Sequence, residues 1–588
     1  MSSRPETPRS AHRHAPGAHP VLPGLPEAVE VFDTTLRDGS QQEGLSLSVD
    51  DKLRVAEQLD HLGVSYIEGG WPGANPKDEE FFARAQKELR LSHATLVAFG
   101  STRRAGVRAE EDEVLRHLVA AGTEAVCIVA KASLLHVTEA LRTTPDEALA
   151  MVESSVAFLR RQGLRVFLDA EHFFDGYRED PAFSRQVLEV AARAGAETLV
   201  LCDTNGGSLP HEVEQAVAEV VAEFDRRIGV HCHNDTGCAV ANSLAAVRAG
   251  ATHVQGCVNG YGERAGNADL AVAIPNLSLK LGVRTIPAER LERLTPVAHH
   301  IAEIVNVPPN PQQPYVGHAA FAHKAGLHTS AIARRRDAYE HISPDAVGNG
   351  TRFVVSELAG RSTVALKAAE LGLDLSSEEV GRALELLKDL EHQGYHFEVA
   401  DASLELLLRQ VGGWRPRYFE LESYRVIADH GGNGHRAAAD GRPVLTEATV
   451  KLTVGGERRI ATAEGNGPVH ALDGALRRAI EPFYPALRQV HLTDFRVRVL
   501  GGGAGTAAVT RVLVDTADPE ATWTTIGVSE NIIEASWQAL VDAVVYGLLR
   551  AGVAPATGPD VLPTGTATPT AETAAAAAGA TAEEVRVP

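Results

Sequence analysis

Three short segments carry side chains that could bind a metal ion and stabilise negative charge. Arg37 and Asp38 belong to the segment DTTLRDGSQ (33–41), His231 and His233 to HCHND (231–235), and Asn267 ends GERAGN (262–267). A carboxylate, two imidazoles and a carboxamide oxygen form a mixed donor set that suits a divalent ion such as Mn, Mg, Zn or Co. Each segment follows an apolar, β-like run, so the strands of one barrel would bring these groups to a common mouth. The sequence therefore predicts a metal site with an arginine beside it.

The spacing of the two histidines is the weakest part of this pattern when taken alone. His231 and His233 are two residues apart on a predicted strand, so their side chains project to the same face. Such a pair is more often two histidines of a core or rim than a metal site. However, Asp38 follows the first predicted strand and Asn267 the eighth, and these two strands are neighbours in a closed barrel. The combination favours a metal site.

Three further polar residues allow two interpretations each. Arg37 could be a surface residue paired with Asp38 or Glu43, or a fixed positive group that stabilises a developing enolate or alkoxide. Glu171 follows the fifth predicted strand and is either a solvated rim carboxylate or an acid/base group. Thr204 follows the sixth strand, and its hydroxyl could bind a substrate carboxylate or cap the next helix.

Composition restricts the class of protein without selecting it. The chain has 588 residues, is 44% hydrophobic and 23% charged, and carries a formal charge of −21. A single core stops growing at roughly 250 to 300 residues, so more than one domain is expected. The acidic balance repels phosphate backbones and anionic lipid, and neither nucleic acid nor a membrane is expected as a main partner. The five cysteines contain no CxxC pair, which argues against disulfides or structural zinc and favours a reducing cytoplasm.

Both ends of the chain have the composition of disordered tails. Residues 1–28 are rich in Pro, Ala, His and Arg and lack the apolar stretch of a secretory signal. Residues 553–588 are mostly Ala, Thr, Pro and Gly, with too little bulky apolar surface to offset the entropy of ordering. No segment is expected to be long and apolar enough to span a bilayer, which takes roughly 20 residues.

Apolar runs alternate with amphipathic helical stretches in the first half of the chain. The predicted strands are 29–32, 66–68, 95–99, 125–130, 165–168, 198–202, 228–233 and 252–258, and helices such as 50–61, 146–161 and 237–249 separate them. Eight such units predict an α/β fold of the (β/α)8 TIM-barrel type, with a catalytic barrel over 29–290.

The rest of the chain has a different pattern. Residues 291–415 read as helical linker subdomains, with a strong helix around 378–390. Residues 416–552 contain alternating strands at 448–454 and 495–499 and helices at 469–480 and 533–544, which predict a C-terminal α+β domain.

These motifs together resemble a known enzyme family. Segment 36–41 with Lys52, segments 231–235 and 262–267, and segment 320–328 (AFAHKAGLH) are similar to signatures of the 2-isopropylmalate, homocitrate and citramalate synthases. The resemblance covers roughly 29–550. Segments 69–73 (GGWPG), 75–78, 394–398 and 400–403 look most like the long-chain (R)-citramalate synthases of that family. The resemblance implies a Claisen-type condensation of acetyl-CoA with pyruvate, followed by thioester hydrolysis to citramalate and CoA, in isoleucine biosynthesis.

The resemblance also assigns roles to residues of this chain. It implies Asp38, His231, His233 and Asn267 as metal ligands, Arg37 as the oxyanion partner, Glu171 as an acid/base group, Thr204 as a pyruvate contact, and His328 with Tyr339 as catalytic residues. Because the family supplies the catalytic histidine from the neighbouring subunit, a homodimer or higher homo-oligomer is expected.

Three features depart from the family pattern or invite a different interpretation. Lys131 begins a segment that only partly follows the expected Lys-Ser-Trp pattern, and Ser330 stands where some citramalate synthases carry an acidic residue. The glycine-rich stretch 501–505 follows one predicted strand and precedes another, so a hairpin is favoured over a phosphate loop.

The C-terminal domain resembles the allosteric module of isopropylmalate synthases. The resemblance rests on GNGP (465–468) at one helix start and NIIEA (531–535) at another. It implies a branched-chain amino acid effector, isoleucine before leucine, and feedback inhibition that is lost when 416–552 is deleted.

Three other functions remain open from the sequence. The nearest is 2-isopropylmalate synthase, which takes 2-oxoisovalerate in place of pyruvate. A lyase such as hydroxymethylglutaryl-CoA lyase uses the same scaffold, but the C-terminal domain argues against it. A catalytically dead amino-acid sensor is disfavoured because Arg37, Asp38, His231 and His233 are intact.

Overall fold

The computed structural model describes residues 24–324, 326–355, 359–429, 445–500 and 508–556. The chain divides into two compact units, Met1–His323 with Ala331–Arg352 and Lys324–Ser330 with Phe353–Pro588. Most of the two predicted tails, and the glycine-rich stretch 501–505, lie outside the described residues. Residues 24–28 are described, and there the Glu27 carbonyl accepts a hydrogen bond of 3.0 Å from the Arg284 N–H.

The first unit contains the predicted eight-stranded barrel, which is confirmed. Its parallel strands are β1 (Glu30–Asp33), β2 (Tyr66–Gly70), β3 (Thr95–Ser101), β4 (Ala125–Lys131), β5 (Arg165–Glu171), β6 (Thr198–Asp203), β7 (Arg227–Cys232) and β8 (His253–Gly256). They pair in sequence order, and β8 closes the sheet on β1. β7 ends one residue earlier than predicted, so His233 lies just beyond the strand.

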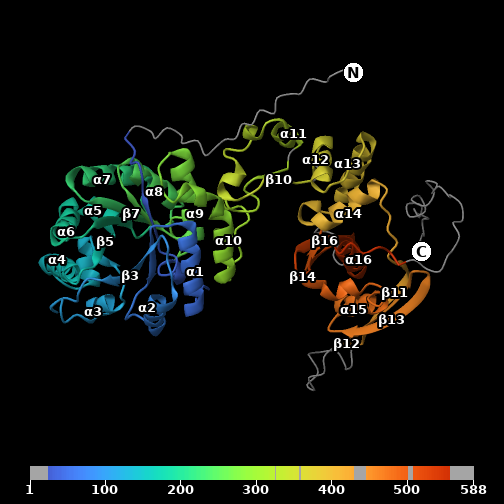
Figure 1. Ribbon diagram of the computed structural model, residues 1–588, viewed down its shortest axis with the longest axis horizontal. Helices are drawn as coiled ribbons and strands as arrows, with labels where there is room; N and C mark the ends of the chain where they lie inside the picture. Colours follow the sequence, from blue (N-terminus) through green and yellow to red (C-terminus); the bar gives the residue numbers. More distant parts are fainter. Residues whose placement is uncertain (1–23, 325, 356–358, 430–444, 501–507, 557–588) are drawn as a thin grey trace, which may run out of the picture. The chain divides into compact units, whose positions relative to one another are not determined.

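Helices alternate with these strands, as predicted (Figure 1). They are α1 (Val49–Leu62), α2 (Pro76–Glu88), α3 (Glu113–Ala120), α4 (Pro145–Arg161), α5 (Phe173–Glu179), α6 (Pro181–Ala194), α7 (Pro210–Glu223) and α8 (Ala239–Arg248). Local sequence sets their ends. Ser48 and Asp51 form a capping box at the start of α1, and Gly63 ends it with φ of 97°, which glycine adopts without strain.

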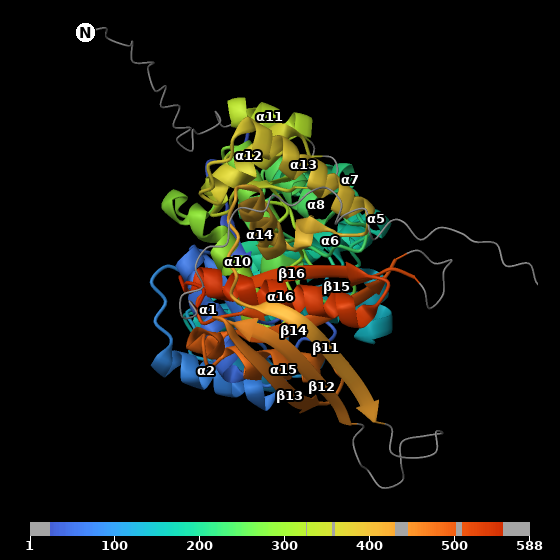
Figure 2. The same cartoon turned by 90° about the vertical axis from the view of Figure 1, so that its right-hand side faces the viewer.

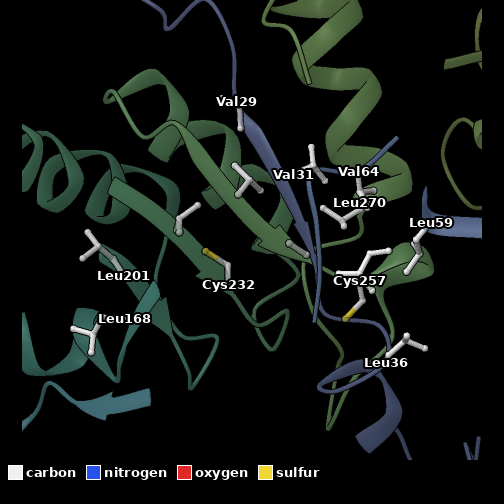
Figure 3. Packing of buried hydrophobic residues seen from close by; sticks show 14 of the residues in the cluster. Val29, Val31, Leu36, Leu59, Val64, Leu168, Leu201, Cys232, Cys257 and Leu270 are labelled. Atoms are coloured by element: carbon white, nitrogen blue, oxygen red, sulfur yellow. The ribbon is translucent and has the colours of Figure 1, made fainter. Parts of the chain in front are cut away.

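Two layers of side chains fill the barrel unit. On alternating positions of β1, Val31 packs outward among residues such as Leu59 and Leu270 (Figure 3), whereas Phe32 points into the barrel. Inside, the ring centroids of Phe32, Tyr66 and Phe167 lie 5.0 to 5.7 Å apart, and the rings meet in tilted or edge-to-face arrangements. These aromatic rings fill the barrel interior below the C-terminal mouth, where barrel active sites form.

The segment after the barrel is divided between the two units. α9 (Leu270–Pro275) and α10 (Leu294–Ile304) belong to the first unit, where α10 packs against α1. The short elements β9 (Ala322–His323), α11 (Gly326–Arg334) and β10 (Arg352–Phe353) follow. α12 (Arg361–Glu370), α13 (Ser377–His392) and α14 (Asp401–Val411) belong to the second unit. The predicted helix at 378–390 is α13.

The second unit also contains the predicted α+β domain, built from a motif used twice. β11 (Glu420–Asp429), β12 (Leu445–Val454) and β13 (Glu457–Gly465) form one antiparallel sheet, covered by α15 (Pro468–Ile480). β14 (His491–Val499), β15 (Thr510–Ala517) and β16 (Thr522–Ser529) form the other, covered by α16 (Ile532–Arg550) (Figure 2).

One helix differs from the expectation about membrane segments. α16 has 19 residues and a mean hydropathy of 1.4, so by length and composition it is able to cross a bilayer, and the expectation that no segment would reach this level was wrong. Half of that stretch is buried within the protein, and residues such as Ala539, Leu540 and Ala543 are buried in the domain core. The helix is apolar because it is the core helix of this domain.

Candidate active site and metal centre

Asp38, His231 and His233 converge at the mouth of the barrel. The Asp38 Oδ2 atom lies 3.3 Å from His231 Nε2 and 3.8 Å from His233 Nε2. The two Nε2 atoms are 3.4 Å apart, and all three side chains are buried. The geometry follows from the strands: His231 lies near the end of β7, and Asp38 lies in the turn that follows β1. Three potential ligand atoms thus lie close enough to hold one metal ion.

Two buried residues orient His231 from behind. The Nδ1–H group of His231 donates to Gln255 Oε1 at 2.9 Å, and Gln255 Nε2 donates to Asp169 Oδ1 at 3.0 Å. In the neutral ring, this hydrogen-bond chain places the proton on Nδ1 and leaves Nε2, which faces Asp38, as the nitrogen able to bind a metal ion. A partner of this kind behind the ligating ring is typical of metal-bound histidines.

Asn267 supplies a fourth candidate ligand, a buried amide oxygen. Its backbone forms an isolated bridge with that of His233, and its Nδ2 donates to the Tyr261 carbonyl at 3.0 Å. The Oδ1 atom is buried and has no hydrogen-bond partner among the described residues. A buried acceptor without a hydrogen-bond partner is energetically unfavourable, and a bound cation would give this oxygen a partner. The four residues therefore fit a divalent ion.

Electrostatics favours the metal-binding form of two of these donors, Asp38 and His233. Burial opposes ionisation of Asp38, but the Arg37 guanidinium and the His231 imidazole outweigh it and hold the pKa of that carboxyl well below its usual range. Burial and repulsion from His231 lower the pKa of His233 to about 4. A carboxylate and a neutral imidazole are the forms that bind metals.

Arg37 lies beside the candidate ligands with its side chain 13% exposed, and it is held from three sides. Its Nε–H donates to Glu68 Oε2 at 2.6 Å, and its NH1 lies 3.3 Å from Asp38 Oδ2. The guanidinium carbon stacks 3.8 Å from the centre of the Phe99 ring. Of the two pairings considered for a surface arginine, the one with Asp38 occurs, but in a buried setting and with Glu68 as the closer partner. Burial and the nearby Asp169, only partly offset by Arg37, raise the pKa of Glu68 to about 7.

These groups line a cavity of about 670 Å³. Its wall is formed by strand ends and the loops that follow them, and it includes Arg37, Asp38, Trp71, Phe99, Val129, Lys131, Asp169, Glu171, Thr204, His231 and His233. The cavity combines a potential metal site, a guanidinium and apolar surface, which is the composition expected of a pocket for a small polar substrate.

Glu171 and Thr204 both face this cavity. Glu171 forms an ion pair with Lys131, which lies directly opposite it on β4. Thr204 Oγ1 accepts a hydrogen bond of 2.8 Å from the His172 N–H, whereas α7 begins after Leu209. Thr204 therefore does not cap the next helix, and its hydroxyl proton is available to a ligand.

His328 and Tyr339 belong to segments that follow the barrel strands. His328 is on α11 in the part of the chain assigned to the second unit, and Tyr339 follows a short helical turn in the first unit, 44% exposed. Tyr339 does not line the cavity. Their contribution from a neighbouring subunit stays a prediction.

Sequence reasoning missed the residues that support the site. Glu68, Asp169 and Gln255 are fully or almost fully buried polar residues on β2, β5 and β8. The available signal was a charged or amide residue inside an otherwise apolar strand, which is unusual unless the group is paired.

A second cavity, of about 570 Å³, lies in the C-terminal domain beside the start of α15 and β14. Val469, Leu487, Leu492 and Phe495 give it an apolar part, and Asp473, Arg477, Glu481 and Arg488 add charges. Arg477 is held by Asp473 at 2.9 and 3.0 Å, which leaves Glu481 and Arg488 as the remaining charged groups of the lining.

Comparison with known proteins extends over both units. Residues 28–297 match the HMGL-like family, 315–395 match the homocitrate synthase post-HMGL domain-like family, and 398–548 match the LeuA allosteric (dimerisation) domain. The chain is 55% identical over 535 residues to a protein of Streptomyces coelicolor named (R)-citramalate synthase, covering 90% of this chain and 99% of that protein.

Similar proteins occur in distant bacteria. The (R)-citramalate synthase of Aquifex aeolicus is 49% identical, with 90% of this chain and 99% of that protein covered. Among solved structures, the hydroxymethylglutaryl-CoA lyase from Pseudomonas aeruginosa matches with 22% identity and a TM-score of 0.42, covering 49% of this chain and 96% of that chain. With these identities over nearly its whole length, the chain belongs to the (R)-citramalate synthases, enzymes that combine an HMGL-like barrel with a LeuA-type allosteric domain.

Proposed function

We propose that this chain condenses acetyl-CoA with pyruvate and hydrolyses the resulting thioester to give (R)-citramalate and CoA, in isoleucine biosynthesis. The observation that carries the proposal is the convergence of Asp38, His231 and His233 in a cavity beside Arg37. The names of the relatives agree with it. All five cysteines are free thiols, four of them buried, which suits a reducing cytoplasm as the compartment.

Asp38, His231, His233 and Asn267 are proposed to hold the divalent ion, whether Mn, Mg, Zn or Co. When bound, such an ion would polarise the keto carbonyl of pyruvate and fix its orientation. In the neutral His231 ring, Gln255 accepts the proton on Nδ1 and so leaves Nε2 as the ligating nitrogen.

Arg37 and Thr204 are proposed to bind pyruvate from opposite walls. The guanidinium of Arg37 is fixed by Glu68 and Phe99, so it offers its remaining N–H groups without reorganisation to the oxygen on which negative charge develops. The Thr204 hydroxyl donates to the carboxylate, because its oxygen already accepts from the His172 N–H.

Proton transfer is assigned to Glu171, His328 and Tyr339. The ammonium group of Lys131 contacts Glu171 and holds its carboxyl group at the cavity wall. His328 and Tyr339 are proposed to come from the neighbouring subunit of a homodimer, and the match to a dimerisation domain supports this assembly.

The second cavity is the proposed site of a branched-chain amino acid effector. Its apolar part would take the side chain, and Arg488 and Glu481 would bind the carboxylate and the ammonium group. Isoleucine is preferred over leucine because citramalate leads to isoleucine. Feedback inhibition would then act from this domain on the barrel.

The proposal is tested by measuring CoA thiol release from acetyl-CoA with either pyruvate or 2-oxoisovalerate as acceptor. We expect a higher kcat/KM with pyruvate than with 2-oxoisovalerate, and (R)-citramalate as the product. A preference for 2-oxoisovalerate would make the chain a 2-isopropylmalate synthase, and no thiol release with either acceptor would leave only a sensor role.

A further inference from the structure

The proposed function poses an electrostatic problem at the barrel mouth. Acetyl-CoA is a polyanion, because the nucleotide end of CoA carries a diphosphate and a 3′-phosphate. The protein has a formal charge of −21. A strongly acidic protein repels such a substrate unless cationic side chains create a local positive field beside the site.

Most cations in the cavity wall are already occupied. Arg37 donates to Glu68 at 2.6 Å, and Lys131 contacts Glu171. Arg264 donates to both carboxylate oxygens of Asp235, at 2.8 and 3.0 Å. These short contacts partly neutralise the three cations and leave little positive charge for a polyanion.

Two arginines on the loop between β3 and α3 behave differently from each other. Arg103 is buried and ties the loop to α4, because its Nε–H donates to Ser154 Oγ and its NH1 to Glu147 Oε1, both at 2.7 Å. The Arg104 side chain is 59% exposed. Its contacts with Asp112 and Glu113 are long, at 3.4 and 3.3 Å. Arg104 is therefore a loosely held cation on an anchored loop.

A groove of about 380 Å³ continues from this loop and shares Arg103 with the cavity. Arg108 lines the groove with its side chain 74% exposed, and Gly106 leaves open space at the turn between the two arginines. Arg108 pairs with Glu111, and Glu110 and Glu147 also line the groove. Exposed ion pairs contribute only about 0 to 1 kcal/mol, so a phosphate dianion would displace such carboxylates from the guanidinium.

We propose that Arg104, with Arg108 as a second contact, binds the phosphate groups of the CoA nucleotide at the rim of the cavity. The proposal rests on the proposed function, since it names the subsite for one of its two substrates. It assigns the β3–α3 loop to recognition of CoA, apart from the residues that perform the chemistry.

The test compares acetyl-CoA with acetyl-pantetheine, which carries the same thioester but no phosphate. Steady-state KM and kcat are measured with saturating pyruvate for the wild type, Arg104→Gln and Arg108→Gln. Arg193→Gln is the matched control. Arg193 is 56% exposed, is paired with Glu153 at 3.1 Å, and precedes the end of α6, which leads to the opposite end of the barrel.

Losing a charge-assisted contact with phosphate should raise KM for acetyl-CoA about tenfold in Arg104→Gln and by a smaller factor in Arg108→Gln. The kcat value with acetyl-CoA, and both parameters with acetyl-pantetheine, should match the wild type, as should all parameters of Arg193→Gln. Rising salt should increase KM for acetyl-CoA less in Arg104→Gln than in the wild type.

An unchanged KM for acetyl-CoA in Arg104→Gln would overturn the proposal, and so would an equal loss with both thioesters. Failure of the proposed function is distinct from either result, because the wild type would then release no CoA in the presence of pyruvate.

Discussion

Replacing Gln255 by leucine tests how the protein prepares His231 for a metal. The substitution keeps the approximate shape of a fully buried side chain but removes its amide. Two groups lose their partner, the Nδ1–H of His231, now 2.9 Å from Gln255 Oε1, and Asp169 Oδ1, now 3.0 Å from Gln255 Nε2. Each buried group left unsatisfied costs about 1 to 3 kcal/mol, so the free energy of unfolding should fall by roughly 2 to 6 kcal/mol.

The same change should weaken metal binding, because the tautomer of His231 is no longer fixed. Loss of such a supporting partner lowers metal affinity by about 10- to 100-fold. The assay is a titration of chelator-treated protein with Mn²⁺, followed by CoA release, together with chemical unfolding of the same samples.

Asn242→Leu is the matched control. Asn242 is a fully buried amide on α8 that donates to the Ser208 carbonyl at 2.8 Å and does not line the cavity. This substitution should lower the free energy of unfolding without changing the Mn²⁺ concentration that gives half-maximal activity. The reasoning is refuted if Gln255→Leu and Asn242→Leu change the Mn²⁺ concentration for half-maximal activity equally, or if neither variant changes it.

Three other variants have defined outcomes. Arg37→Lys keeps the charge but loses the planar fork held by Glu68, so kcat should fall about 10²- to 10³-fold; a change of less than threefold would show that the guanidinium geometry is not needed. Arg488→Gln should raise the isoleucine concentration for half-inhibition about tenfold and leave uninhibited kcat unchanged, and an unaltered inhibition curve would place the effector elsewhere. Burial, only partly offset by the Ser403 hydroxyl, raises the pKa of Asp542 from 3.8 to about 6, so the folded protein retains a proton that the unfolded chain releases, and stability falls as pH rises through about 6. Asp542→Asn should therefore be more stable than the wild type by about 3 kcal/mol at pH 8 but not at pH 4, measured by chemical unfolding, and equal differences at both pH values would contradict this.

The barrel, and the convergence of Asp38, His231 and His233, could be predicted from sequence because both are encoded locally. Strand-like runs repeat with helical intervals, and a two-residue spacing on a strand determines that His231 and His233 share a face. Asp38 and Asn267 could be added because the first and last strands of a closed barrel are neighbours. These inferences need only the order of the elements.

The supporting residues could not be predicted because they depend on distant packing. Gln255 and Asp169 are on β8 and β5, and only the closed barrel brings their side chains to hydrogen-bonding distance. Similarly, the helical pattern after residue 290 does not reveal that α10 packs on α1 whereas α14 packs on α16. Thr204 accepts a hydrogen bond from the His172 N–H and does not cap a helix, and this too depends on how the loops are arranged.

The most direct test of the account is the activity of metal-stripped protein. After removal of metal ions by a chelator, pyruvate-dependent CoA release should disappear, return on addition of a divalent ion, and not return in Asp38→Asn, because the carboxylate shared by His231 and His233 is lost. Undiminished turnover by the stripped protein would contradict the role assigned to these residues.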